Sequence, residues 1–392
     1  MSIIGIGEDG LAGLSEASRN ALARAETVFG GERHLRLAHV DGRGQAWPVP
    51  FDAACVLSRR GRPTAVLASG DPFWHGAGGS LAAQLSPDEW IAHPSPSTFS
   101  LAAARLGWPL ESTICIGLHA APFERLVPLL SRGAQIICLV RDAKAAGDLA
   151  SWLTARGFGA SRLWSLSALG GSRESVTEGK AESFTVGDAV SPLALAIEAD
   201  GAAGLPRVSG LADDLFQHVG QITKRPIRAL ALSALAPRPG EHLWDIGAGS
   251  GSISIEWALA GGNAIAIEVR EDRVANIRAN AEAFGVMHKV TIITGTAPAA
   301  LASLDKPDAA FIGGGLDAAM FDSIWALMPD GARLVAHCVT LETEALLSVL
   351  QQGYGGELMR IDISHAMPLG RMRSWEASRP VVQWHVVKKG RP

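Results

Sequence analysis

One stretch, residues 242–255, constrains the fold more than any other part of the chain. It reads His-Leu-Trp-Asp-Ile-Gly-Ala-Gly-Ser-Gly-Ser-Ile-Ser-Ile. The apolar start predicts a strand, and the apolar spacing after the glycines predicts an amphipathic helix. The three glycines let the backbone turn sharply and let a ligand lie against it, facing the free N–H groups of the helix N-terminus. The stretch therefore predicts an α/β domain with a ligand crevice at a strand end.

Two acidic residues near this turn indicate which nucleoside would fit. A second predicted strand, 264–267, ends in Glu268, whose carboxylate suits a ribose diol. Asp245 stands where a pyrophosphate would arrive, so it disfavours a dinucleotide and would attract an ammonium group. Ser252 also stands where the dinucleotide fingerprint has its third glycine. The pattern resembles motif I of the Rossmann-like methyltransferases, which use S-adenosyl-L-methionine. A glycine-rich turn without a ligand is the alternative.

Length and composition limit the remaining possibilities. A chain of 392 residues predicts two domains, and its 47% hydrophobic and 19% charged residues are ordinary for a globular protein. The net charge of −4 gives no general attraction to nucleic acid. The four cysteines are widely spaced and predict reduced thiols, the histidines show no metal-ligand spacing, and no apolar run is long enough to span a membrane. His34 and His39 come closest to a metal pair, and a solvated surface pair is the favoured interpretation. We expect a cytoplasmic protein without a metal site or membrane anchor.

The first half carries other short motifs at the ends of predicted strands. A strand at 2–6 runs into Gly-x-Gly-x-x-Gly, which matches the dinucleotide fingerprint, but no acid closes the next strand. A buried strand at 64–68 ends in Ser-Gly-Asp-Pro, which contains Gly70 and Asp71. Three residues of this kind usually form an ordinary turn, so their neighbours decide the interpretation.

Those neighbours are a third strand and a capped helix. The strand at 90–93 leads into Pro-Ser-Pro-Ser-Thr, where Ser97 or Thr98 can cap a helix that ends at Gly107 and can also offer hydroxyls to a ligand. The rest of this half predicts a strand at 134–140, a helix at 143–155, a loop at 168–174 that opens another helix, and a closing strand at 192–198.

Together these motifs resemble the tetrapyrrole methylase fold over roughly residues 1–200. The resemblance implies two small α/β layers with S-adenosyl-L-methionine bound in the cleft between them. The chain departs from the family where Ser95-Pro96 replaces a glycine before the Ser-Thr pair. The residues that the resemblance places at the cofactor are Gly70, Asp71, Ser97 and Thr98, with Leu169 on the adenosine.

The second half begins after a connector of small residues, 200–206, so the expected domains are 1–204 and 205–392. Thr223 reads as the N-cap of a helix over 227–235. Lys224, Arg225 and Arg228 at its start form either a solvated helix terminus or an anion site beside the cofactor. Arginine binds carboxylates through two hydrogen bonds, so a polycarboxylate substrate would use such a cluster.

Further along, predicted strands end in residues suited to a ligand. The strand at 290–294 leads to Ala297, in the turn where methyltransferases commonly contact the adenine. The strand at 308–312 ends in three glycines, which favours either a crevice left open for a large planar substrate or a dense loop. Arg371 and Arg373 lie on a loop between the closing strands, and are either substrate ligands or surface charges. Those two strands are predicted at 357–364 and 381–387.

A tetrapyrrole methylase half joined to a Rossmann-like half resembles the precorrin-6Y C5,15-methyltransferase (decarboxylating) family of aerobic cobalamin biosynthesis. The resemblance implies methylation at C-5 by the first half, and methylation at C-15 with loss of carbon dioxide from an acetate side chain by the second, giving precorrin-8. It further implies one S-adenosyl-L-methionine per domain and a tetrapyrrole substrate. We also expect a homo-oligomer. The cofactor residues that it implies in the second half are Thr223, Gly247, Ala248, Gly249, Ser250, Gly251, Glu268 and Ala297.

Three other functions stay open at this point. An NAD-linked oxidoreductase would use the glycines near the N-terminus, and the missing acid disfavours it. A nucleic-acid methyltransferase is disfavoured by the acidic pI near 6.3 and by the lack of an Asn-Pro-Pro-Tyr motif after Ile312. A non-catalytic cofactor sensor is the third. No catalytic residue is identified, because methyl transfer needs no strong base. His337 is a weak candidate for the proton donor in decarboxylation and reads better as a structural histidine.

Overall fold

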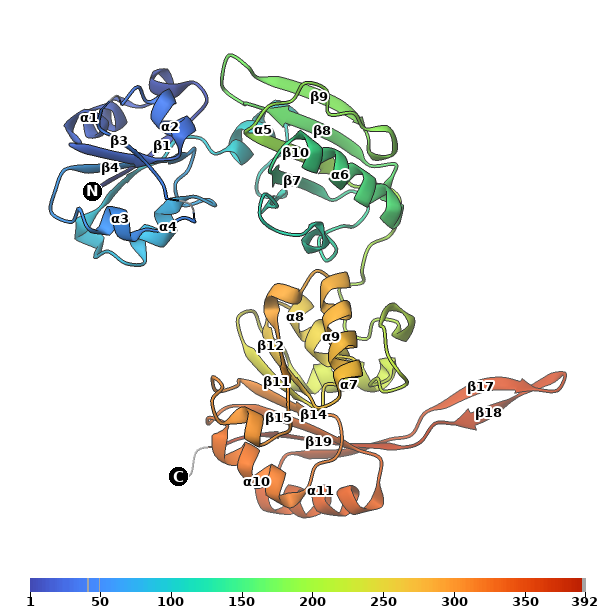
Figure 1. Ribbon diagram of the computed structural model, residues 1–392. Coiled ribbons are helices and arrows are strands. Elements are labelled where there is room, and N and C mark those ends of the chain that lie inside the picture. The colour runs from blue at the N-terminus through green and yellow to red at the C-terminus, as the bar shows by residue number, and fades with distance from the viewer. Residues whose placement is uncertain (41, 49, 390–392) are drawn as a thin grey trace. The chain divides into compact units, whose positions relative to one another are not determined.

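The structure is a computed structural model that describes residues 1–40, 42–48 and 50–389. The chain divides into two compact units, and a short piece of the first half belongs to the second unit. The first unit comprises Met1–Phe123 and Leu129–Gly204, and the second comprises Glu124–Pro128 and Leu205–Pro392. Figure 1 shows the elements of each unit.

The first sheet of the first unit is parallel throughout, with strand order β3-β2-β4-β1-β5. Its strands are apolar on both faces, as expected of a parallel sheet covered on both sides by helices. Ile4 and Leu67 pack toward α1 and α2, and Ile3 and Val66 toward α3 and α4. The elements are β1 (Ser2–Ile6), α1 (Glu16–Arg24), β2 (Thr27–Gly30), α2 (Glu32–Leu37), β3 (Gly44–Ala46), α3 (Ala54–Leu57), β4 (Thr64–Ser69), α4 (Ala77–Ala82) and β5 (Ile91–His93).

The second sheet of this unit is mixed, with strand order β6-β7-β10-β8-β9. Only β6 and β7 run parallel, and the other neighbours are antiparallel. Phe99 and Ala103 on α5 pack against Leu166 and Ala194. The elements are α5 (Thr98–Leu106), β6 (Ile114–Gly117), β7 (Gln135–Val140), α6 (Ala143–Leu153), β8 (Arg162–Ser167), β9 (Ser175–Lys180) and β10 (Leu193–Glu198).

The prediction of a helix after the loop at 168–174 is wrong. The loop opens β9, an edge strand that pairs antiparallel with β8 in the register Leu166↔Val176. The β-branched Val176 and Thr177 suit a strand, and Arg162 on β8 pairs with Glu178 on β9 at 2.8 Å. These partners come from another strand, so local sequence could not reveal them.

The second unit is built on a seven-stranded sheet with order β13-β12-β11-β14-β15-β19-β16. The first five strands are parallel, and β19 and β16 add an antiparallel edge. This arrangement confirms the predicted fold class. The elements are α7 (Arg225–Leu235), β11 (His242–Ile246), α8 (Ser252–Leu259), β12 (Asn263–Glu268), α9 (Glu271–Ala283), β13 (Val290–Thr294), β14 (Ala309–Ile312), α10 (Ala318–Leu327), β15 (Arg333–Cys338), α11 (Leu341–Tyr354), β16 (Glu357–Ile361) and β19 (Val381–Val387).

Helices cover both faces of this sheet. On one face, α7, α8 and α9 bury Trp257 and Phe311, and on the other, α10 and α11 bury Trp244 and Trp384 (Figure 1). Because both faces are covered, the ligand crevice of such a sheet lies at the carboxyl ends of its parallel strands.

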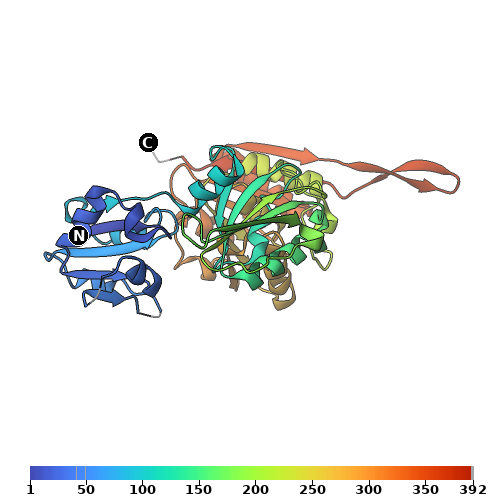
Figure 2. The same cartoon turned by 90° about the horizontal axis from the view of Figure 1, so that it is seen from above.

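The prediction of a loop that carries Arg371 and Arg373 is wrong. Residues 364–377 form a β-hairpin of β17 (Ser364–Leu369) and β18 (Met372–Ala377). Arg371 lies in its turn and Arg373 on β18, and both are exposed. The hairpin extends away from the seven-stranded sheet in both views (Figures 1 and 2).

Two kinds of feature are absent from residues 1–40, 42–48 and 50–389, the part of the chain that the structure describes. Within that part of the chain no helix is both long and apolar enough to cross a membrane. Within the same residues no three His, Cys, Asp or Glu side chains gather closely enough to hold a metal ion.

Candidate functional site

The glycine turn between β11 and α8 has the backbone that the sequence predicts. Gly247, Gly249 and Gly251 have φ values of +69°, +60° and +74°, in the left-handed region that disfavours side chains. Gly247 and Ala248 donate their N–H groups to the carbonyl of Ile267, at 2.9 and 3.0 Å. Apart from its two chain neighbours, no atom of the described residues lies within 4 Å of a Cβ built on Gly247. The turn is therefore held against β12 and leaves open space at Gly247, a cradle that a side chain would fill.

Glu268 lies at the end of β12 and is bound to this turn. It is 2% exposed, and its Oε2 accepts a hydrogen bond from Gly249 N at 2.9 Å. Its Oε1 accepts from Val269 N and Arg270 N, at 2.9 and 3.1 Å. A carboxylate satisfied by three backbone N–H groups has a fixed position, as the predicted ribose ligand requires.

Asp245 lies on β11 and is bonded to the helix that follows the turn. It is 1% exposed, and its Oδ2 accepts from Ser254 N at 3.1 Å and from Ser254 Oγ at 2.6 Å. Burial raises the pKa of Asp245 from 3.8 to about 6, and the charge of Glu268 adds to the rise although the bonds from Ser254 oppose it. Asp245 thus holds the first turn of α8, and its attraction for a ligand ammonium stays a prediction.

Two further strand ends meet the same turn. Gly295, after β13, donates its N–H to the carbonyl of Glu268 at 3.1 Å, so the turn with half-buried Ala297 lies beside that acid. A Cβ built on Gly313, after β14, would lie 3.8 Å from the carbonyl oxygen of Gly247. The sequence-predicted residues Gly247–Gly251, Glu268 and Ala297 thus gather along one edge of the sheet.

The start of α7 departs from the prediction. Lys224 is the N-cap residue, without a side-chain hydrogen bond, so Thr223 as the N-cap is wrong. Thr223 is half-buried, whereas Lys224 and Arg225 are exposed. Arg228 is fully buried and bonded within the protein, so the anion site considered for it is wrong. Its charge is compensated by Glu256 and Asp213.

In the first unit the glycines have a different environment. A Cβ on Gly5 would lie 1.7 Å from the carbonyl oxygen of Gly70, and one on Gly70 would lie 2.7 Å from that of Pro96. Ser95 donates its N–H to Gly70 O at 3.1 Å and its hydroxyl to Gly5 O at 2.8 Å. Gly5 is packed against backbone, which leaves no room there for the dinucleotide of an NAD-linked oxidoreductase.

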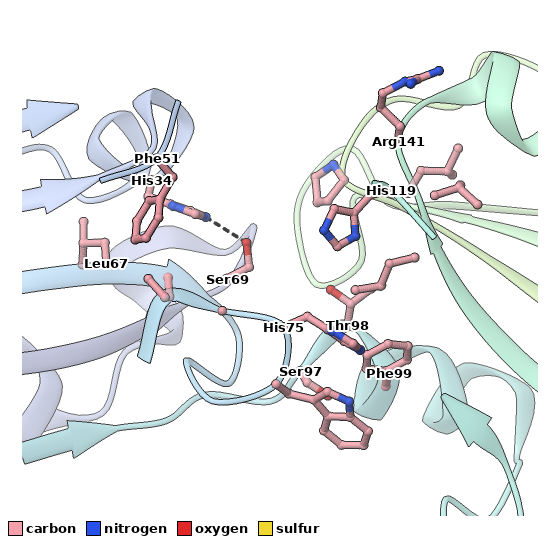
Figure 3. Close-up of a pocket in the computed structure, with 18 of the residues that line it drawn as sticks. His34, Phe51, Leu67, Ser69, His75, Ser97, Thr98, Phe99, His119 and Arg141 are labelled. Atoms are coloured by element: carbon pink, nitrogen blue, oxygen red, sulfur yellow. Dashed lines mark hydrogen bonds between the residues drawn. The ribbon is translucent and has the colours of Figure 1, made fainter. Parts of the chain in front are cut away.

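A cavity of about 610 Å³ lies next to this packed junction, within the first unit. Figure 3 shows that its walls come from both sheets of the unit, with Ser97 and Thr98 at the start of α5. The aromatic walls include Phe51 and Phe99. The polar lining side chains that the sequence did not single out for a cavity include His34, Ser69, His75, His119 and Arg141.

His34 has a strongly lowered pKa in this cavity. Its Nε2 lies 2.8 Å from Ser69 Oγ (Figure 3). The same Nε2 lies 2.8 Å from Arg33 Nη2, which also donates to Ser69 Oγ at 2.7 Å. Burial, followed by the charge of Arg33, lowers the pKa of His34 from 6.5 to about 4. A neutral imidazole that accepts at Nε2 carries its proton on Nδ1, which is buried and has no partner among the described residues. The predicted solvated surface pair with His39 is therefore wrong for His34.

The remaining predicted residues of the first unit lie around this cavity in different ways. Ser97 caps α5, accepting from Ser100 N at 3.1 Å, and Thr98 is half-buried beside it. Asp71 accepts from Phe73 N at 2.9 Å in the turn after β4. Leu169 is 4% exposed in the core beneath α5 and is not among the residues that line the cavity.

Residues that sequence reasoning missed belong to contacts between distant elements. His34, Ser69 and His119 approach one cavity from separate parts of the first unit. Glu256 and Arg228 left a signal, because a charged residue inside an apolar helical stretch must find a buried partner.

Comparison with known proteins identifies the two halves separately. Residues 1–185 match the family described as Tetrapyrrole (Corrin/Porphyrin) Methylases, and residues 214–388 match the Precorrin methyltransferase domain. The Precorrin-6Y C(5,15)-methyltransferase (decarboxylating) of Sinorhizobium sp is 48% identical over 99% of this chain and 96% of its own length. The protein of the same name from Mycobacterium tuberculosis (strain CDC 1551 / Oshkosh) is 39% identical over 99% of both chains.

A shorter relative covers less of the chain. The Probable cobalt-precorrin-6B C(15)-methyltransferase (decarboxylating) of Pyrobaculum calidifontis is 35% identical over 180 residues, which are 44% of this chain and 92% of that protein. Relatives that match nearly from end to end, together with a family match for each half, establish the assignment. The chain belongs to the precorrin-6Y C(5,15)-methyltransferase (decarboxylating) family, and is thus an S-adenosyl-L-methionine-dependent C-methyltransferase.

Proposed function

We propose that this enzyme methylates precorrin-6Y at C-5 and C-15 and removes carbon dioxide from an acetate side chain, giving precorrin-8 in cobalamin biosynthesis. The observation that carries the proposal is the pairing of a glycine turn and fixed Glu268 in one unit with a polar-lined cavity in the other. This pairing supports the proposal of one methyl-donor site in each unit, one for each methylation.

We propose that each unit binds one S-adenosyl-L-methionine. In the second unit the open space at Gly247 fits a ligand that lies against the backbone, and Glu268 fits a ribose diol. Thr223, Ala248, Ser250 and Ala297 would complete this site. In the first unit Ser97 and Thr98 line the cavity, and Gly70 and Asp71 follow β4 at its side. The position predicted for Leu169 on the adenosine is the weakest fit, because Leu169 lies in the core.

The chain's own contribution to methyl transfer is alignment and exclusion of water. When bound, the cofactor supplies an electrophilic methyl group, and a reduced tetrapyrrole supplies nucleophilic carbon atoms. Fixing two reactants in line is worth up to roughly 7–11 kcal/mol, so no strong base is required. The carboxylate of Glu268 accepts three backbone hydrogen bonds. It and the backbone groups of the turn are therefore already in place and need not change position during the reaction.

The proposed substrate is a polycarboxylate, and cationic side chains would bind its carboxylates. Lys224 and Arg225 stay predictions for that role in the second unit, and both are exposed at the start of α7. Arg371 and Arg373 also stay predictions, on the exposed hairpin. His337 is buried, and its Nε2 lies 2.8 Å from Gln383 Oε1, which favours the structural role over that of a proton donor.

We further propose that the chain forms a homo-oligomer and acts in the cytoplasm. The hairpin supports the first point, because Met367, Leu369, Met372 and Trp375 are 44–78% exposed on an arm that projects from its sheet. Sedimentation of the Trp375→Ser variant beside wild type tests this, and an unchanged mass would contradict a role for the hairpin.

Calorimetry and mass spectrometry together test the proposed function. Titration of the intact chain with S-adenosylhomocysteine should give two equivalents per chain. Incubation of precorrin-6Y with S-adenosyl-L-methionine should add two methyl groups and remove one carbon dioxide. A single binding equivalent would contradict the proposal of one cofactor per unit. Methylation of a different acceptor, with precorrin-6Y left unmethylated, would contradict the proposed substrate.

A further inference from the structure

Residues 210–224, here called the strap, form an irregular segment ahead of α7 that lies against the glycine turn of the second unit. Leu211 and Phe216 anchor it in the core, at 2% and 4% exposure, with Ile277 on α9. The carbonyl oxygen of Gln221 approaches so closely that a Cβ on Gly249 would lie 3.1 Å from it. The strap therefore forms a wall beside the turn, and it carries Thr223, one of the residues predicted to bind the cofactor.

A buried ion pair fixes the two ends of the strap. Glu256 on α8 accepts from Gly210 N at 2.6 Å, from Leu211 N at 3.0 Å and from Arg228 Nε at 2.6 Å. The Nη1 of Arg228 donates to Asp213 Oδ1 at 3.0 Å and to the carbonyl of Thr223 at 2.5 Å. Arg228 is fully buried, so these bonds hold the strap and are not open to a ligand.

A buried amide fixes the middle of the strap directly to the turn. Asn280 on α9 is 1% exposed, and its Oδ1 accepts from Gln217 N at 2.7 Å. Its Nδ2 donates to the carbonyls of Gln217 and Ser250, both at 2.9 Å. One side chain thus joins the strap to the glycine turn with all three bonds on backbone atoms.

We infer that Asn280 is a positioning residue for the cofactor site of the second unit. The ion pair of Arg228 and Glu256 supports it by holding the two ends of the strap. Burying an amide and an ion pair costs free energy unless every polar atom has a hydrogen-bond partner. Apolar side chains in their place would hold α8 and α9 together as well, so stability alone does not explain these polar groups. What the polar groups add is a fixed register between strap and turn, because their partners are the backbone atoms of those two segments. The inference rests on the proposed cofactor site at that turn.

The test is a hydrogen-exchange titration of the full-length chain with S-adenosylhomocysteine, comparing wild type with Asn280→Asp. The substitution keeps the shape and the acceptor for Gln217 N, but sets a carboxylate oxygen against two carbonyls. Protection of the peptide 242–256 against ligand concentration reports the dissociation constant at this turn alone. We expect that constant to rise about tenfold, which corresponds to the loss of buried hydrogen bonds. The peptide 211–224 should lose protection without ligand, while strands β14 and β15 keep theirs.

Asn276→Asp is the matched control, because Asn276 lies one turn earlier on α9 and its amide bonds to none of the described residues. It should leave both peptides unchanged. If Asn280→Asp unfolds, Asn280→Ser, which is smaller and uncharged, replaces it in the same titration. A strap that loses protection without any change in ligand affinity would overturn the inference, as would a strap that keeps its protection. Absence of ligand protection at 242–256 in wild type would instead overturn the proposed function.

Discussion

Glycine serves the two units of this enzyme in opposite ways. In the first unit Gly5 and Gly70 bring three backbone segments into contact, and a methyl group at Gly5 would meet a carbonyl oxygen at 1.7 Å. In the second unit Gly247 has a φ of +69° and open space around its Cβ position. Gly5 is thus needed for packing, whereas Gly247 is needed for its backbone conformation and for access of a ligand.

This difference shows why a glycine motif alone does not identify a ligand site. Both motifs follow an apolar strand and both resemble nucleotide fingerprints, yet the Cβ position is open at Gly247 and filled by backbone at Gly5. The neighbouring residues distinguish them, because Glu268 is bonded to the second turn whereas Ser95 fills the first junction. Substitutions that add one methyl group can test the comparison directly.

The largest effect is expected for Gly5→Ala. The added methyl would overlap the carbonyl of Gly70, and backbone on both sides prevents relief. We expect a loss of about 4 kcal/mol or more in the free energy of unfolding of the first unit, in the range of severe overpacking. Thermal unfolding followed by calorimetry measures it.

Gly79→Ala is the control for this variant. Gly79 lies on α4, and no atom comes within 4 Å of its Cβ position. Alanine in that helix should stabilise slightly, by roughly 0.5–1 kcal/mol. Equal stability of the Gly5 and Gly79 variants would remove the contrast between a packed and an open glycine.

Next in size are opposite pH dependences in the two units. His34, with a pKa lowered to about 4, binds its proton only in the unfolded chain between pH 4 and 6.5, so the first unit should gain stability as pH rises through that window. Asp245, with a pKa raised to about 6, keeps its proton only in the folded chain between pH 3.8 and 6, so the second unit should lose stability as pH rises. Each change should amount to roughly 3 kcal/mol.

The variants His34→Gln and Asp245→Asn isolate these contributions. Each removes one titrating group while keeping a polar side chain for its neighbours, so each should flatten the pH profile of its own unit only. Hydrogen exchange of the buried strands β1 and β11 at several pH values gives the two stabilities separately. Profiles that stay parallel to wild type in both variants would show that other groups determine the pH dependence.

The sequence predicted the parts of the fold that depend on local pattern. The apolar runs and glycines around β11, β12 and β14 sufficed for their positions, and Glu268 was predicted at the end of its strand because the strand pattern stops there. The same reasoning missed β9 and the hairpin of β17 and β18, since strand pairing depends on a partner. A loop and an edge strand of similar composition look alike without that partner.

The site was predicted less completely than the fold, for a related reason. Backbone crevices leave a glycine signature, whereas the cavity of the first unit depends on side chains such as His34 and Ser69, which are 35 residues apart and meet at 2.8 Å. The N-cap position also depends on backbone angles, and these favour Lys224 over Thr223, whose hydroxyl is not used as a cap. Sequence alone therefore identified the turn and Glu268 beside it, but not the side chains that line the cavity of the first unit.

A smaller effect is expected for Gly247→Ala. No clash arises, so the cost to stability should be only the roughly 1–2 kcal/mol of a left-handed backbone. The methyl group would occupy the open space at the turn, and S-adenosylhomocysteine should bind the second unit about tenfold more weakly or worse, with the first unit unaffected. Gly240→Ala, at a φ of +84° with equal space, should show the strain without the loss of affinity. Equal affinities in the two variants would contradict a ligand at Gly247.

The smallest effect is expected for Gly315→Ala, and it tests whether openness alone marks a ligand site. Gly315 has a φ of +72° and no atom within 4 Å of its Cβ position, so about 1 kcal/mol of strain is expected. It follows β14, two residues beyond Gly313, where the substrate and not the cofactor should approach. The KM for the tetrapyrrole in the methylation by the second unit should rise a few-fold, while affinity for S-adenosylhomocysteine stays unchanged.

Gly331→Ala controls for strain, because Gly331 has a φ of +86° and the same free space in a turn before β15, at the opposite end of the parallel strands. It should match Gly315→Ala in stability and match wild type in KM. If Gly315→Ala also matched wild type in KM, free space at a strand end would not be sufficient for contact with substrate. An open glycine would then identify a ligand site only where a fixed acidic side chain such as Glu268 lies beside it. Without that acid, an open glycine could not be told from one in an ordinary loop.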